Sequence, residues 1–153
     1  EGISREKSFN LIVEALIKLS DYALQRGVTI CVETHDSWCE PQAVAAVMKN
    51  VNQSTIAVNW DIMHPVLRTS CTMIESFKIL KPWIKHVHVH DGLITDRGLE
   101  FKSIGEGKVD HKTAIKLLKD SGYNGFLSGE WINWEPYDIH LPRELKLMKS
   151  FEQ

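Results

Sequence analysis

Four short segments rich in β-branched residues alternate along this chain with longer segments whose apolar residues recur every three to four positions. The first pattern predicts buried strands and the second predicts amphipathic helices. Parallel strands need long crossover connections, and these are usually helices. The alternation therefore predicts an α/β fold with a parallel sheet, with strands expected at 28–33, 55–61, 84–90 and 126–130 and helices at 4–26, 41–48, 72–80, 111–120 and 143–151.

Single residues mark where several of these helices begin or end. Ser4 and Asp110 are typical N-caps, because their side chains accept hydrogen bonds from free backbone N–H groups. Gly27 suits the left-handed conformation that often ends a helix. Pro41 and Pro142 are both expected at the first position of a helix, where proline is well tolerated.

Two architectures accommodate four β/α units in a single domain over residues 1–153. One is a small doubly wound sheet, and the other is half of a (β/α)8 barrel, which as a whole needs roughly 250 residues. Composition and periodicity do not choose between them.

Composition excludes several other classes of protein. Hydrophobic residues make up 43% of the 153 residues and charged residues 25%, with a formal net charge of -2. This is a globular balance, and it gives no reason to expect nucleic-acid or membrane binding. The chain shows no signal-peptide pattern, and its three cysteines form no C-x-x-C motif. We therefore expect a cytoplasmic protein.

A carboxylate or an imidazole stands at the end of every expected strand. These residues are Glu33, Asp61, His88 and Glu130. The carboxyl ends of parallel strands lie together, and three carboxylates crowded there would repel one another without a cation. Three oxygen ligands and one nitrogen ligand suit Mn²⁺, Mg²⁺, Co²⁺ or Zn²⁺. Taken singly, a glutamate at a strand end is more often a solvated residue or a helix cap.

Other polar residues near these strand ends allow more than one interpretation. His86 and His90 share one face of the strand with the candidate ligand His88. His64 follows Asp61 by three positions and suits a ligand, a substrate contact or a turn. The glycine-rich stretch 92–107 is expected to be a loop, and its Gly-Glu-Gly is more typical of a plain turn than of a phosphate cradle.

The ordered motifs resemble the carboxy-terminal half of the xylose isomerase-like TIM barrels, the sugar phosphate isomerase/epimerase superfamily. The resemblance covers essentially the whole chain and places its four strands as strands five to eight of the barrel. Four stretches carry it. Residues 27–35 contain Glu33 at the end of the strand, 61–65 read Asp-Ile-Met-His-Pro, and 86–91 read His-Val-His-Val-His-Asp. The last stretch comprises 105–107, Asp110, 122–125 and Glu130.

The resemblance implies a divalent-metal-dependent sugar or sugar-phosphate isomerase or epimerase. Glu33, Asp61, His88 and Glu130 would bind one metal ion. Glu33 and Glu130 would also be the catalytic groups, one removing the proton beside a sugar carbonyl and the other returning a proton through a metal-stabilised enediolate.

The same resemblance assigns substrate contacts. His64 and Arg97 would bind polar groups of a small-molecule sugar, and His35 and Trp60 would form walls of the pocket. Only four of eight β/α units are present, so we expect the chain to be a fragment of a longer protein. The missing half barrel, or a second copy, would cover the exposed sheet edges, and the isolated half is expected to be a poor catalyst.

Three alternatives remain open at this point. An apurinic-endonuclease-like zinc phosphodiesterase would share the strand-end residues, but the net charge of -2 and Gly98, at a position where a histidine ligand would be expected, count against it. A keto-inositol dehydratase would use the same metal and the same proton removal. A non-catalytic scaffold would keep only the fold.

Overall fold

The computed structural model describes residues 2–152 and contains four parallel strands that end within one residue of the expected positions. They are β1 (Ile30–Glu33), β2 (Ile56–Asp61), β3 (Ile84–Val89) and β6 (Leu127–Gly129). The strands pair in the order β1-β2-β3-β6, and every pairing is parallel. The expected α/β class with a parallel sheet is confirmed.

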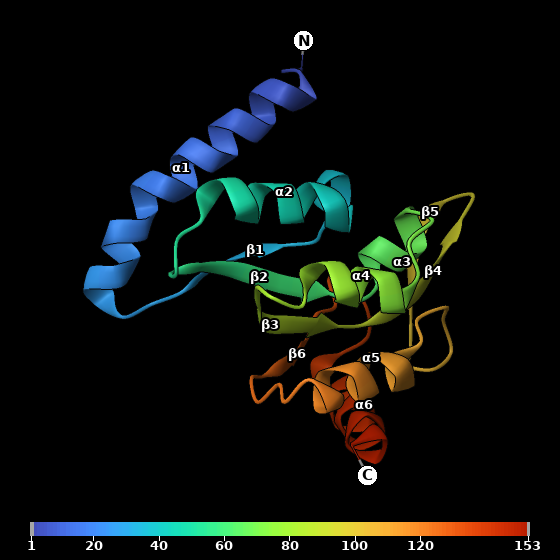
Figure 1. Ribbon diagram of the computed structural model, residues 1–153. Helices are drawn as coiled ribbons and strands as arrows, with labels where there is room; N and C mark the ends of the chain where they lie inside the picture. Colours follow the sequence, from blue (N-terminus) through green and yellow to red (C-terminus); the bar gives the residue numbers. More distant parts are fainter. Residues whose placement is uncertain (1, 153) are drawn as a thin grey trace.

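Five longer helices form a layer that follows the sheet. These are α1 (Arg5–Arg26), α2 (Pro41–Val51), α4 (Met73–Leu80), α5 (His111–Asp120) and α6 (Tyr137–Phe151). Each helix contacts the next one in this order, from α1 near β1 to α6 near β6 (Figure 1). Each strand lies beside the next one in the sheet, and the connecting helices lie in a single layer. This arrangement corresponds to about four units of a (β/α)8 barrel. Within residues 2–152, β1 and β6 each have one sheet edge without a neighbouring strand.

Most of the expected helix ends are confirmed by their local geometry. Ser4 Oγ accepts a hydrogen bond from the backbone N–H of Lys7, at 3.2 Å. Gly27 has a φ of 63°, the left-handed conformation expected for a residue that ends a helix. Pro41 is the first residue of α2, and the carboxylate of Asp110 caps α5.

The expected start of the last helix was wrong. α6 begins at Tyr137, and Pro142 lies inside it. His140, Glu144 and Met148 are buried and spaced by four residues, so they lie on one face of a helix that extends across the proline. The free energy gained by packing this face outweighs the cost of the helical hydrogen bond that is missing because Pro142 has no backbone N–H.

The glycine-rich stretch after β3 is more ordered than the loop that was expected. It contains an antiparallel hairpin of β4 (Asp91–Thr95) and β5 (Gly98–Lys102), which projects from the end where β3 stops (Figure 1). Gly98 has a φ of 106° in the turn, a value that side chains disfavour. Two short helices, η1 (Asp36–Trp38) and α3 (His64–Arg68), follow β1 and β2.

The apolar core lies between the sheet and the helices. Trp60, Val58 and Val87 on the strands and Val44 and Leu80 on the helices are fully buried. Within residues 2–152, none of the helices combines the length and the apolar character needed to cross a bilayer.

Candidate metal centre

The four strand-end residues come together in space. Glu33, Asp61, His88 and Glu130 each offer one ligand atom, and these atoms all lie within 4.8 Å of one another. His88 Nδ1 lies 2.6 Å from Glu33 Oε1 and 3.2 Å from Glu130 Oε2. The sequence predicted this grouping, although the residues are up to 97 positions apart (130 minus 33).

Sheet register explains the grouping. Asp61 and His88 are directly paired neighbours on β2 and β3. Glu33 ends β1 and Glu130 follows β6, so the two glutamates come from the outer strands and flank the central pair. Side chains alternate along a strand, and these four point to the same face of the sheet.

The donor set fits a divalent cation. Three carboxylates and one imidazole supply hard oxygen ligands and one nitrogen ligand, and the carboxylates are close enough to repel one another strongly when no cation is present. The Asp61 side chain is fully buried, whereas those of Glu33, His88 and Glu130 are 29%, 22% and 28% exposed. The site is therefore anchored at its base and open on its outer side.

Asp61 is held in place by its neighbours. Its Oδ1 accepts hydrogen bonds from the backbone N–H groups of Met63 and His64, each at 2.8 Å. Its own backbone N–H donates to Thr34 Oγ1, and the Thr34 hydroxyl donates to its carbonyl. Burial tends to raise the pKa of Asp61, but the bonds and charges of His90 and His64 outweigh this and lower it. Asp61 is therefore a carboxylate.

His90 connects Asp61 to the end of β6. Its Nε2 lies 2.6 Å from Asp61 Oδ2, and its Nδ1 lies 2.9 Å from the carbonyl oxygen of Glu130. Both partners are acceptors, so both ring nitrogens donate and the ring is an imidazolium. Burial lowers the pKa of His90, but Asp61 and Glu130 raise it by more. Sequence reasoning assigned His90 no role, although its place in His-x-His-x-His on one strand face was a signal.

His64 is the first residue of α3 and lies beside the candidate ligands. It is 2% exposed, and its ring centroid lies 3.8 Å from that of His35. Burial lowers the pKa of His64 to about 4, although the charge of Asp61 opposes this shift. The ring is therefore neutral near pH 7.

A second group of possible ligands lies next to the first. His35, Asp36 and His64 offer atoms within 4.8 Å of one another. However, the guanidinium of Arg68 already lies there, with Nε 3.1 Å from His64 Nδ1 and Nη2 3.5 Å from Asp36 Oδ1. A fixed positive charge at this position disfavours a cation bound by these three residues.

Two of the expected substrate contacts lie apart from the four strand-end residues. Trp60 is fully buried on the opposite strand face, where its Nε1 donates to Ser76 Oγ of α4 at 2.9 Å. This position corrects the expectation that Trp60 forms a wall of the pocket. Arg97 is exposed at the turn of the hairpin and forms no hydrogen bond or ion pair with the four residues in the part of the chain that is described.

The Gly-Glu-Gly stretch surrounds a side chain of the protein itself. The buried carboxylate of Asp91 accepts hydrogen bonds from the backbone N–H groups of Gly92 and Gly105 at 2.8 Å and of Gly107 and Val109 at 3.1 Å. A Cβ at Gly107 would collide with this carboxylate. The interpretation as a structural turn is therefore favoured over a phosphate cradle.

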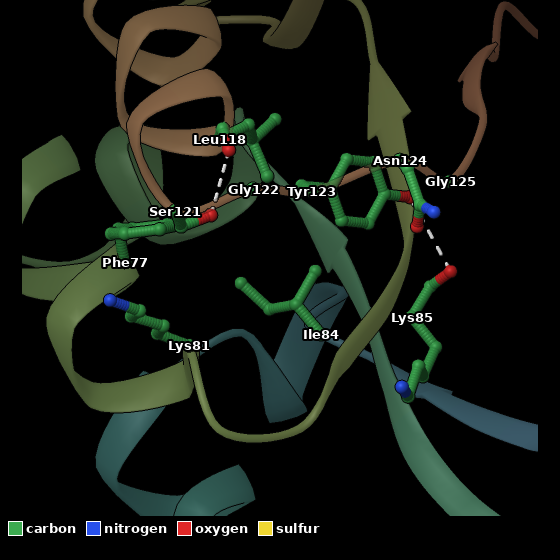
Figure 2. A pocket seen from close by; sticks show the side chains of 10 residues that line it. All are labelled: Phe77, Lys81, Ile84, Lys85, Leu118, Ser121, Gly122, Tyr123, Asn124 and Gly125. Carbon is green, nitrogen blue, oxygen red and sulfur yellow. Dashed lines mark hydrogen bonds between the residues drawn. The ribbon is translucent and has the colours of Figure 1, made fainter.

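A cavity of about 220 Å³ lies at the opposite end of β3, between the ends of α4 and α5 (Figure 2). Its lining includes Lys81, Lys85, Ser121 and Tyr123, and the Tyr123 hydroxyl donates to the Lys85 carbonyl at 3.4 Å. No carboxylate or imidazole is among the residues that line it, so it offers none of the ligand types found in the strand-end group.

Parallel strands, a single helix layer and candidate ligands at the carboxyl ends of the strands are typical of a β/α-barrel protein. The family model described as the xylose isomerase-like TIM barrel matches residues 1–151, so this chain belongs to that family. The resemblance seen in the sequence is thereby confirmed.

Individual relatives are distant and longer. The chain is 24% identical over 131 residues to the uncharacterized protein MJ1311 of Methanocaldococcus jannaschii, covering 82% of this chain and 43% of that protein. D-psicose 3-epimerase of Clostridium cellulolyticum H10, solved with D-tagatose, superposes with a TM-score of 0.82 at 16% identity, covering 100% of this chain and 59% of the epimerase.

Another similar structure was solved with a bound metal ion. A xylose isomerase-like TIM barrel protein of Mycobacterium smegmatis, solved in complex with magnesium, has a TM-score of 0.77 at 16% identity, covering 99% of this chain and 53% of that protein. At these identities the structural likeness establishes the fold alone. The chain spans little more than half the length of the two structures and less than half the length of MJ1311.

Proposed function

We propose that this chain is the metal-binding and proton-transferring half of a sugar or sugar-phosphate isomerase or epimerase. The observation that carries the proposal is the convergence of Glu33, Asp61, His88 and Glu130 within 4.8 Å. These four residues would hold one divalent ion, Mn²⁺, Mg²⁺, Co²⁺ or Zn²⁺. When bound, such an ion polarises a carbonyl and offsets the negative charge that develops beside it.

The positions of the two glutamates support a proton-transfer role. They reach His88 Nδ1 from the two outer strands of the sheet, at 2.6 and 3.2 Å. A carbon chain bound beside His88 would therefore meet one carboxyl group on each side. One of them takes the proton from the carbon next to the carbonyl. The other, protonated at the start, returns a proton to the opposite face or to the neighbouring carbon.

The imidazoles beside the site support recognition of a hydroxylated substrate. His64 is neutral and almost fully buried, and His35 packs against it with an exposed edge. Such rings exclude water and bind hydroxyl or carbonyl oxygens. The remaining length of the related proteins would supply further walls of the pocket, so activity is proposed for the whole protein.

The first experiment is elemental analysis of the purified protein after dialysis. We expect about one divalent ion per chain, lost in Glu130→Ala and kept in Glu14→Ala, which removes an exposed carboxylate of α1. Two or three zinc ions per chain would instead favour a phosphodiesterase, and metal-free protein would count against the proposal.

The second experiment detects proton transfer even when the product is unidentified. The intact protein is incubated with a panel of ketoses and ketose phosphates in D₂O, and NMR follows deuterium entering the carbon beside the carbonyl. Metal-dependent incorporation is expected for at least one compound. A panel that stays fully protonated in the presence of bound metal would overturn the proposed chemistry.

A further inference from the structure

Arg68 forms a directed contact with His64 that the proposed proton transfer does not use. His64 is the first residue of α3 and Arg68 is the last, and a spacing of four places both on the same helix face. Arg68 Nε–H donates to His64 Nδ1 at 3.1 Å.

The guanidinium is oriented from its other side. Its Nη2 lies 3.5 Å from Asp36 Oδ1, and Asp36 is held on η1 in a left-handed conformation with a φ of 42°. The same carboxylate oxygen is 4.0 Å from His64 Nδ1, which is too long for a hydrogen bond. Arg68, not Asp36, is therefore the partner of this ring nitrogen.

This contact sets which nitrogen of His64 carries hydrogen. A guanidinium has only donors, so a hydrogen on Nδ1 would face the N–H of Arg68. Nδ1 must accept, and the single hydrogen of the neutral ring must lie on Nε2. Across residues 2–152, His64 Nε2 forms no hydrogen bond with the protein, and the ring lies beside Asp61, with one nitrogen within 4.8 Å of the ligand atoms of Asp61 and His90.

We propose that Arg68 is a positioning residue that fixes His64 as the Nε2–H tautomer and so makes it a hydrogen-bond donor to a substrate oxygen at the metal centre. The inference rests on the proposed function and narrows its substrate class. A hydroxyl or carbonyl oxygen accepts this hydrogen bond, whereas a protonated amino group cannot. The site is therefore built for an oxygen substituent at this position and disfavours an amino sugar there.

Long-range ¹H–¹⁵N NMR of the histidine rings tests the tautomer directly, without metal or substrate. The His64 signals are assigned by their loss in His64→Gln. In the wild-type protein we expect Nδ1 to resonate as an unprotonated nitrogen and Nε2 as a protonated one. In Arg68→Met, which removes the donor from a side chain that is 38% exposed, the two signals should move toward each other as both tautomers become populated.

The control is Arg26→Met, the same chemical change at the far end of α1, which should leave the His64 signals in place. Circular dichroism verifies that each variant is folded. A protonated Nδ1 in the wild type, or unchanged His64 signals in folded Arg68→Met, would overturn the role of Arg68. Because this readout needs neither metal nor turnover, such a failure is distinct from a failure of the proposed function, which the metal analysis and deuterium exchange test separately.

Discussion

His90 donates to the buried carboxylate of Asp61 across 2.6 Å, while its other ring nitrogen bonds the backbone of Glu130 at 2.9 Å. One imidazole thus connects a candidate metal ligand on β2 to the backbone of another beyond β6. Partners of this kind orient ligands and tune their charge, and removing them typically weakens metal binding.

The first prediction concerns this link. In His90→Gln, Asp61 loses its positively charged partner and the bridge to Glu130 is broken. We expect the affinity for Mn²⁺, measured by calorimetry, to fall about 10-fold or more. His86→Gln is the matched control, since His86 lies on the same strand face and its ring packs against that of His88, but its side chain forms no hydrogen bond among the described residues. Equal affinities in the two variants would remove His90 from the metal centre.

Variants of the two glutamates should distinguish removal of the substrate proton from its return. Glu33→Gln and Glu130→Gln keep an oxygen ligand but lose a group that takes or gives a proton. We expect product formation to fall by about 10²- to 10⁴-fold in each. Deuterium exchange of the substrate should survive in one variant and vanish in the other. Unimpaired turnover in either variant would exclude that glutamate as a catalytic group.

Asp91 should be a stability determinant. Its carboxylate accepts four backbone N–H groups, and an asparagine would place its own donors against some of them. We expect Asp91→Asn to lower the free energy of unfolding by about 2–3 kcal/mol, measured by urea denaturation. Asp96→Asn, in the exposed hairpin turn, should change it by less than about 0.5 kcal/mol. Similar stabilities would show that the four bonds matter little.

The N-cap of α5 should make a pH-dependent contribution to the free energy of unfolding. Hydrogen bonds from the side chain and the backbone of Thr113 lower the pKa of Asp110. A carboxyl group whose pKa is lowered by folding stabilises the fold fully at pH values above its unfolded-state pKa. This stabilisation is lost as the pH falls through the folded-state pKa. Asp110→Ala should therefore cost about 1 kcal/mol at pH 7.

The difference should disappear in acid, because protonation removes the carboxylate that caps the helix. The unfolding free energies of wild type and Asp110→Ala are compared by urea titration from pH 7 to below 3.8, the ordinary pKa of the group. Asp21→Ala, on the exposed face of α1, serves as the control. A difference that persists unchanged at low pH would contradict the charged cap.

Interactions between residues close in the chain were readable from the sequence. β-branched runs predicted the four strands, and the caps at Ser4, Gly27 and Asp110 were correct because they depend only on the adjacent turn. Carboxylates at strand ends predicted the grouping around His88, since parallel strands bring their carboxyl ends together. The motifs, taken in order along the chain, were likewise sufficient to identify the family.

Contacts between distant segments were decided only by the tertiary structure. Pro142 lies inside α6 because the buried face of that helix outweighs the local preference of proline. The hairpin that begins at Asp91 is ordered in part by a carboxylate buried among backbone donors up to 18 residues away. The bridge from His90 to Asp61 spans 29 residues, and the contact of Arg68 with Asp36 joins α3 to η1, so neither partner follows from adjacent residues. Such contacts exist only once the sheet register and the packing of α3 bring their partners within hydrogen-bonding distance.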